Sequence, residues 1–221
     1  MCGRFTLTAT PDAVQQAFNL SAVPAGLVPR FNIAPSQPVA VITNENPREL
    51  TFHKWGLIPS WSKDPSAAAR MINARSETAA EKPAFRAAFR RRRCLIPADG
   101  FFEWQAQAGD KVPLFIHFEG RPVFAMAGLW EVWLDADGGE VRTCTILTTE
   151  ANAFMRAIHD RMPVILRPED YEDWLFPGEA AQSALQPLMR PFEPAGMAAY
   201  QVSKLVNRPG NDSPEVIQPV V

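Results

Sequence analysis

The chain has 221 residues, of which 47% are hydrophobic and 21% are charged, and its formal net charge is −2. This length suits one domain with a buried core, and the near-neutral charge excludes binding to nucleic acid through an overall basic field. No apolar run approaches the about 18 residues that a membrane-spanning helix requires.

The first part of the chain predicts short strands around one helix. In chain order, we expect a strand at residues 3–8, a helix from residue 11 to about residue 19, an ordered loop at 21–38, and a hairpin of strands 38–43 and 49–55. Thr10 followed by Pro11 is typical of a capped helix start. The proline spacing of residues 21–38 disfavours a regular helix or a central strand there.

The rest of the chain predicts successive hairpins followed by helices. We expect a helix at 83–90, strands at 94–97, 100–105, 112–119, 123–134 and 140–148, a helix at 150–158 capped by Thr149, a strand at 162–166, helices at 168–175 and 179–189, and a strand at 198–203. Hairpins without a βαβ alternation predict an α+β fold with a mainly antiparallel, strongly curved or barrel-like sheet and peripheral helices. We assign residues 2–210 to a single domain and 211–221 to a C-terminal tail.

The three cysteines offer neither a disulfide framework nor a CxxC metal motif. Their odd number and the lack of a signal peptide predict a cytoplasmic protein. Cys94 and Cys144 lie in apolar, strand-like stretches, where we expect buried structural thiols. Three scattered histidines without an HExxH motif give no support to metal catalysis, so we expect no metal and no cofactor. We expect a monomer that does not contact membranes.

Cys2 is the most reactive candidate, because removal of Met1 would place a thiol and a free α-amine on one residue. The amine titrates near about 8 and the thiol near about 8.5, so both nucleophilic forms exist close to neutral pH. With an aldehyde, the amine can form a Schiff base and the sulfur can then close a thiazolidine ring. The alternative is a translation start followed by an inert, small hydrophobic residue.

Asn73 lies in a short polar segment between Arg70 and Arg75. Its amide supplies both donors and acceptors, and arginine binds phosphate with a forked geometry. On these residues alone, an asparagine-stabilised turn with solvated arginines is the favoured interpretation.

Two other residues are candidates for proton transfer. Glu103 stands between Phe102 and Trp104, and apolar rings raise the pKa of a carboxyl group and keep it a proton donor. The alternative is an outward-facing strand residue. His159 follows a predicted helix end, where it either satisfies terminal carbonyls or transfers protons near neutral pH.

Trp55 and Trp61 lie in a segment broken by glycine and proline. A loop of this kind does not easily bury two indoles, and an exposed indole can stack on the bases of a single strand.

Six segments of the chain, taken together, are distinctive. In chain order they are Met-Cys-Gly-Arg-Phe at the start, Asn32-Ile-Ala-Pro35, Trp55-Gly-Leu-Ile-Pro-Ser-Trp61, Asn73-Ala-Arg-Ser-Glu77, residues 97–104, and His159-Asp-Arg-Met-Pro163. Together they closely resemble the SRAP family, the SOS-response-associated peptidase-like, abasic-site-processing proteins. The resemblance extends from residue 2 to about residue 210. Each segment alone is weak, but six in the family's order are specific.

The resemblance implies covalent capture of abasic sites in single-stranded DNA during the response to DNA damage, with reversal or AP-lyase chemistry as further outcomes. By motif position, it implies Cys2 as the nucleophile, Asn73 as the residue that positions the terminus and the sugar, Glu103 as the acid–base group and His159 as a second proton-handling group. It also implies DNA contacts at Arg4, Pro35, Trp55, Trp61, Arg75 and Arg161.

Two other functions fit parts of the sequence. An N-terminal-nucleophile amidohydrolase also begins Met-Cys-Gly, and the family's peptidase label suggests related self-processing or peptide cleavage. A non-covalent single-strand binder would use the tryptophans and arginines while Cys2 stayed inert. Both DNA-binding hypotheses predict salt-sensitive binding, so only a complex that survives denaturation separates them.

Overall fold

The computed structural model describes residues 2–107 and 109–220, so Met1 and Val221 lie outside the described residues. One of its two sheets is open and contains five strands. Its strand order is β13 (Met197–Gln201), β8 (Asp110–Phe118), β7 (Gly100–Gln107), β1 (Phe5–Leu7) and β2 (Arg30–Ile33). Their pairings are antiparallel.

The second sheet closes on itself. Its ring consists of β3 (Pro38–Thr43), β4 (Leu50–Trp55), β6 (Arg93–Ala98), β9 (Phe124–Leu134) and β10 (Glu140–Glu150). Three short strands extend it: β5 (Asn73–Arg75), β11 (Arg161–Pro163) and β12 (Ile165–Leu166). Among the named strands of the described residues, the pairings of β10 with β4 and β5 are parallel and the others are antiparallel. The predicted α+β fold with a mainly antiparallel, barrel-like sheet is therefore confirmed.

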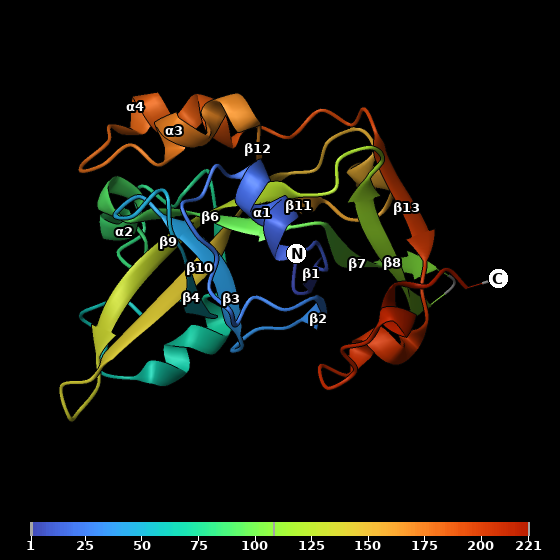
Figure 1. Cartoon of the computed structure of the whole chain (residues 1–221), viewed down its shortest axis with the longest axis horizontal. Helices are drawn as coiled ribbons and strands as arrows, with labels where there is room; N and C mark the ends of the chain where they lie inside the picture. The colour runs from blue at the N-terminus through green and yellow to red at the C-terminus, as the bar shows by residue number, and fades with distance from the viewer. Residues whose placement is uncertain (1, 108, 221) are drawn as a thin grey trace.

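Short helices surround the sheets (Figure 1). They are α1 (Pro11–Ala17), α2 (Arg86–Arg91), α3 (Tyr171–Trp174) and α4 (Gln182–Leu185), with 3-10 turns between and after them. The Thr10 side chain accepts a hydrogen bond from the Ala13 amide at 3.2 Å, which confirms the predicted cap of α1. Across residues 2–107 and 109–220, no helix has the length and apolar character that crossing a membrane requires.

The predicted helix at residues 150–158 is wrong. Strand β10 continues to Glu150, and its last three residues pair with β11. Only one 3-10 turn (Met155–Ala157) follows, and its first amide is capped by the Asn152 side chain at 2.9 Å rather than by Thr149. The β-branched Thr148 and Thr149 suit a strand, and the ladder with β11 overrides the local helix signal.

The predicted loop at residues 21–38 contains a strand that the proline spacing concealed. Strand β2 pairs with β1 through Phe5 and Ile33, so β1 has a neighbour along each edge. Figure 1 shows β1 in the middle of the molecule, between the barrel strands and the β7–β8–β13 sheet.

The C-terminal part of the chain packs on the open sheet as two 3-10 turns, η5 (Lys204–Asn207) and η6 (Pro214–Ile217). Val206 and Val216 are fully buried against Phe102 and Phe115. Residues 211–220, which we predicted to form a tail, thus contribute to the core. The division of the chain at residue 210 stays a prediction.

Candidate active site

Cys2 lies in the core between the two sheets and is fully buried. Its position follows from the pairing of β1 with β7, in which the Phe102 amide donates to the Arg4 carbonyl at 3.0 Å. The Cys2 thiol donates to the same carbonyl oxygen, with an Sγ–O distance of 3.8 Å. Burial raises the pKa of this thiol, and the nearby Glu103 carboxylate raises it further. The sulfur is therefore held as a neutral thiol at neutral pH.

Glu103 lies on β7 opposite Leu114 and is only 2% exposed. This burial excludes the alternative of an outward-facing strand residue. Burial also raises the pKa of the Glu103 carboxyl, while the charge of His159 works in the opposite direction. The Glu103 carboxyl group therefore keeps its proton at pH values above the ordinary titration range of a glutamic acid. It lies close enough to Cys2 for the two side chains to interact electrostatically.

Asn73 reaches the same place from the barrel. It begins β5, which pairs in parallel with β10 through Ile146 and Asn73. Its Nδ2 donates to the Cys2 carbonyl oxygen at 2.8 Å. Its Oδ1 is buried and accepts no hydrogen bond from the part of the chain that the structure describes. One side of the amide therefore holds the Cys2 backbone, and the other side offers an acceptor to a bound group.

His159 lies at the edge of this group and is partly exposed. Its Nδ1 accepts a hydrogen bond from the Arg161 amide at 2.9 Å and lies 2.8 Å from Oδ1 of Asp160. The alternative predicted from the sequence is a ring that donates to carbonyls at a helix end. The contact of Nδ1 is different, because this atom accepts from a backbone amide. The charge of His159 acts on Glu103, so the two proton-transfer candidates share one environment.

The three arginines implied as DNA contacts have different surroundings. Arg75 is exposed. The Arg161 guanidinium binds both carboxylate oxygens of Glu77, at 2.5 and 2.9 Å, and also donates to the Thr148 carbonyl at 2.6 Å. Arg4 is half-buried and donates to neutral acceptors within the protein.

The register of β10 brings two of these arginines together. Thr148 pairs with Arg75 on β5, and Glu150 pairs with Arg161 on β11. Arg75 and Arg161 therefore flank the same end of β10, beside Asn73.

The two indoles differ sharply in exposure. Trp61 is 65% exposed, whereas Trp55 is only 1% exposed because it ends strand β4 and packs edge-on against Phe5, with ring centroids 5.2 Å apart. The Trp55 Nε1 donates to the Ile72 carbonyl at 2.8 Å, immediately before Asn73. In this structure Trp55 supports β5 and presents no face for stacking. Pro35 is half-buried in the turn after β2.

Across residues 2–107 and 109–220, no group of three or more histidine, cysteine, aspartate or glutamate side chains is arranged to hold a metal ion. Cys94 and Cys144 are fully buried, as predicted for structural thiols.

Comparison with known proteins places this arrangement in a family. The family described as SOS response associated peptidase (SRAP) matches residues 1–209. The chain belongs to the SRAP family. It is 46% identical to the abasic site processing protein YoqW of Bacillus subtilis over 99% of both chains. It is also 30% identical to the abasic site processing protein HMCES of Xenopus tropicalis, covering 100% of this chain and 79% of the relative.

A solved structure supports the same fold. The crystal structure of a protein from Bacteroides thetaiotaomicron matches with a TM-score of 0.88 and 29% identity, covering 100% of both chains. The two-sheet architecture of this SRAP chain is therefore shared with an experimentally determined structure.

Sequence analysis assigned no role to Asn32, Glu77 or the C-terminal segment, although all three contact the predicted site residues. One signal was available for Asn32: a polar residue between the apolar Phe31 and Ile33 is unexpected in a buried strand. The three backbone carbonyls that accept from the Asn32 side chain lie more than 170 residues away, so no local pattern identifies them.

Replacing Trp55 tests whether this residue is a support. We expect Trp55→Phe to lower the free energy of unfolding by about 2 kcal/mol, because the Ile72 carbonyl loses its donor and a buried volume is left unfilled. Trp61→Phe is the matched control and should change it by no more than about 0.5 kcal/mol. Urea denaturation followed by circular dichroism measures both. Equal effects of the two substitutions would contradict this interpretation.

Proposed function

We propose that this SRAP protein processes abasic sites in single-stranded DNA by forming a covalent thiazolidine through Cys2 after removal of Met1. The observation that carries the proposal is the convergence of the Cys2 backbone, the Asn73 amide and the buried Glu103 carboxyl between the two sheets. The relatives YoqW and HMCES are named abasic site processing proteins, which supports abasic-site processing as the activity.

The proposed reaction begins with ring opening. An abasic deoxyribose is mostly a closed hemiacetal. Glu103 donates a proton to the ring oxygen, the C1′–O4′ bond breaks, and the C1′ hydroxyl loses its proton to water to leave the aldehyde. The raised pKa of Glu103 suits this role, because a donor must still carry its proton near neutral pH.

Capture then takes two bond-forming steps. The Cys2 α-amine attacks C1′ and water leaves to give an imine; the thiol sulfur then adds to the same carbon while its proton passes to the nitrogen. No electrons are gained or lost overall. Asn73 holds the Cys2 carbonyl during both steps, and its open Oδ1 can accept a hydrogen bond from a sugar hydroxyl. Glu103 and His159 supply protons for reversal or for strand-cleaving lyase chemistry.

The DNA strand would contact Arg75, Arg161 and the exposed indole of Trp61, with Pro35 nearby. Arginine–phosphate contacts and stacking on an aromatic ring are the usual means of binding a single strand without reading its sequence. The Glu77 carboxylate occupies the forked donors of Arg161 in this structure, so a phosphate would replace it.

The first prediction concerns the nucleophile. Wild-type protein mixed with uracil-excised single-stranded DNA should give a complex that survives denaturing electrophoresis and has the intact mass of a dehydrated adduct. Cys2→Ala should lose this complex but retain salt-sensitive binding.

Three other results would contradict the proposal, and two of them would indicate a different function. A full yield of adduct from Cys2→Ala would refute the proposal. Wild-type binding without any denaturation-resistant complex would indicate a non-covalent binder, and glutaminase turnover without DNA would indicate an amidohydrolase.

A second prediction concerns pH. Burial favours the neutral carboxyl, so Glu103 loses its proton only as pH rises through a pKa that lies above the ordinary value. The ratio of the adduct-forming rate constants of the wild type and Glu103→Gln should therefore fall as pH rises. The ionised Glu103 carboxylate also raises the pKa of the Cys2 thiol, which lowers the ratio in the same direction. Single-turnover kinetics across the pH range measures this ratio. A ratio that rises with pH would indicate that Glu103 acts as a base.

A third prediction concerns Glu77. Its pKa is lowered by Arg161, so it is ionised and competes with phosphate for the guanidinium. We expect Glu77→Gln to bind single-stranded DNA at least about threefold more tightly, with a log–log salt slope steeper by about 0.7 for one additional phosphate contact. Fluorescence anisotropy at several salt concentrations measures both quantities.

Glu140→Gln is the matched control for Glu77→Gln, because it makes the same change in charge at the opposite end of β10. An equal gain in affinity from both substitutions would show that overall charge, rather than release of Arg161, is responsible.

A further inference from the structure

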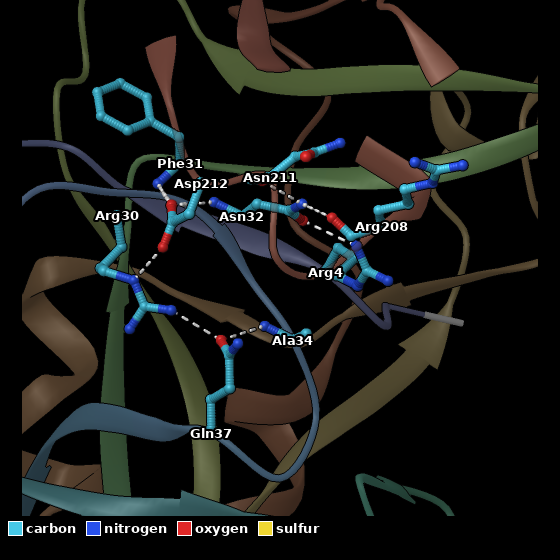
Figure 2. A network of polar contacts seen from close by, with 9 residues as sticks. All are labelled: Arg4, Arg30, Phe31, Asn32, Ala34, Gln37, Arg208, Asn211 and Asp212. Carbon is cyan, nitrogen blue, oxygen red and sulfur yellow. Dashed lines mark hydrogen bonds and ion pairs between the residues drawn. The ribbon is translucent and has the colours of Figure 1, made fainter. Parts of the chain in front are cut away.

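Asn32 is a fully buried hub that connects the first strand to the C-terminal segment (Figure 2). Its Oδ1 accepts a hydrogen bond from the Arg4 guanidinium at 2.8 Å. Its Nδ2 donates to three backbone carbonyls of the C-terminal segment, those of Val206, Arg208 and Asn211, at 3.2, 3.1 and 2.7 Å. The two sides of one amide thus bind two parts of the chain that are far apart in sequence.

Asp212 fastens the same segment to β2. Its carboxylate accepts from the backbone amides of Phe31 and Asn32, at 2.5 and 2.9 Å, and forms an ion pair with Arg30. Arg30 also donates to Gln37, whose side chain accepts from the Ala34 amide (Figure 2). These contacts hold the loop between η5 and η6 beside β2. They combine the ion pair and charge-assisted hydrogen bonds of Asp212 with the neutral hydrogen bonds of Asn32.

The end of η5, which leads into this loop, contacts residues on both sides of the candidate active site. The Arg4 guanidinium donates to the carbonyls of Val206 and Asn207, and the Asn207 side chain accepts from the Trp104 indole at 2.8 Å. Arg4 is two residues from Cys2, and Trp104 follows Glu103. The segment therefore fixes the neighbours of both proposed reacting groups.

Among the described residues, the backbone at Cys2 is held from β5 and from β7. The described contacts are the Asn73 bond to its carbonyl and the β7 bond to the Arg4 carbonyl. A chain end of this kind frays unless side chains tie it down. The Arg4 side chain links this end of the chain to Asn32 and to the C-terminal segment.

We propose that the Val206–Asp212 segment is part of the active site, and that Asn32 and Asp212 are positioning residues that hold Cys2 in place through Arg4. This inference rests on the proposed function of Cys2 in its catalytic consequence, but its structural consequence is independent of that function. Without the hub, Arg4 loses its acceptors, the Cys2 backbone moves, and its amine and thiol no longer meet C1′ in a reactive geometry.

The test uses the full chain with Asp212→Ala and Asn32→Asp. The first removes the fastening of the segment, and the second turns the donor that faces three carbonyls into a repelling oxygen. Lys204→Met is the matched control, because it removes an exposed ion pair with Asp110 at the start of η5, just before this segment, without touching the hub.

The first readout is site-resolved alkylation by iodoacetamide, quantified by peptide mass spectrometry. Cys94 and Cys144 are internal controls, since both are fully buried in the barrel strands β6 and β10, whereas Asn32 lies in the open sheet. We expect Asp212→Ala and Asn32→Asp to raise alkylation of Cys2 about tenfold or more while the other two thiols stay protected. Lys204→Met should stay within about twofold of the wild type.

The second readout is the rate of adduct formation at saturating abasic DNA, measured beside the dissociation constant. The two hub variants should react about tenfold or more slowly with little change in affinity. Wild-type levels of Cys2 alkylation and adduct formation in both variants would overturn the inference, as would a parallel rise in alkylation of all three thiols, which would mean general destabilisation. A wild-type protein that forms no adduct would refute the proposed function, and the alkylation result would still decide the positioning role.

Discussion

Strand β1 has only three residues, yet it must hold a chain end between two sheets, and the geometry of the whole site depends on that restraint. Its ladder to β7 sets the Arg4 carbonyl, and the Asn73 amide sets the Cys2 carbonyl. Ordering each backbone residue costs about 1–2 kcal/mol, so two such bonds do not easily hold a terminus alone. The contacts of the Arg4 side chain add the missing restraint.

Burial has opposite consequences for the two central groups. It raises the pKa of Glu103, which favours an acid, and it raises the pKa of the Cys2 thiol, which disfavours a thiolate. An ionised carboxylate beside a thiolate in this apolar setting would be doubly unfavourable. In the proposed reaction, the nitrogen of Cys2 therefore attacks first, and the sulfur follows once an electrophilic imine carbon lies beside it and its proton has an acceptor.

The sequence identified the elements whose signals are local. Turn residues between β-rich runs predicted the hairpins, and Thr10-Pro11 predicted the start of α1. Strands β2 and β5 were missed because they are only three or four residues long and their partners are distant strands. The motifs brought Cys2, Asn73 and Glu103 forward as candidates, but Asn32 and Asp212 bind mostly to backbone groups, and backbone partners leave no trace in a side-chain pattern.

The three arginines of the candidate site show why a motif does not define a role by itself. Arg75 is free of the restraint that burial imposes, Arg161 is held by Glu77, and Arg4 is engaged by neutral acceptors inside the protein. The charge of Arg75 acts on Glu77, but among the described residues Arg75 forms no direct ion pair. A phosphate gains more from a guanidinium that is not held in a direct ion pair, because displacing an ion pair offsets part of the new attraction. Arg75 would therefore make the first contact with a DNA strand, Arg161 would join when Glu77 leaves, and Arg4 would act on the reaction through the backbone of Cys2.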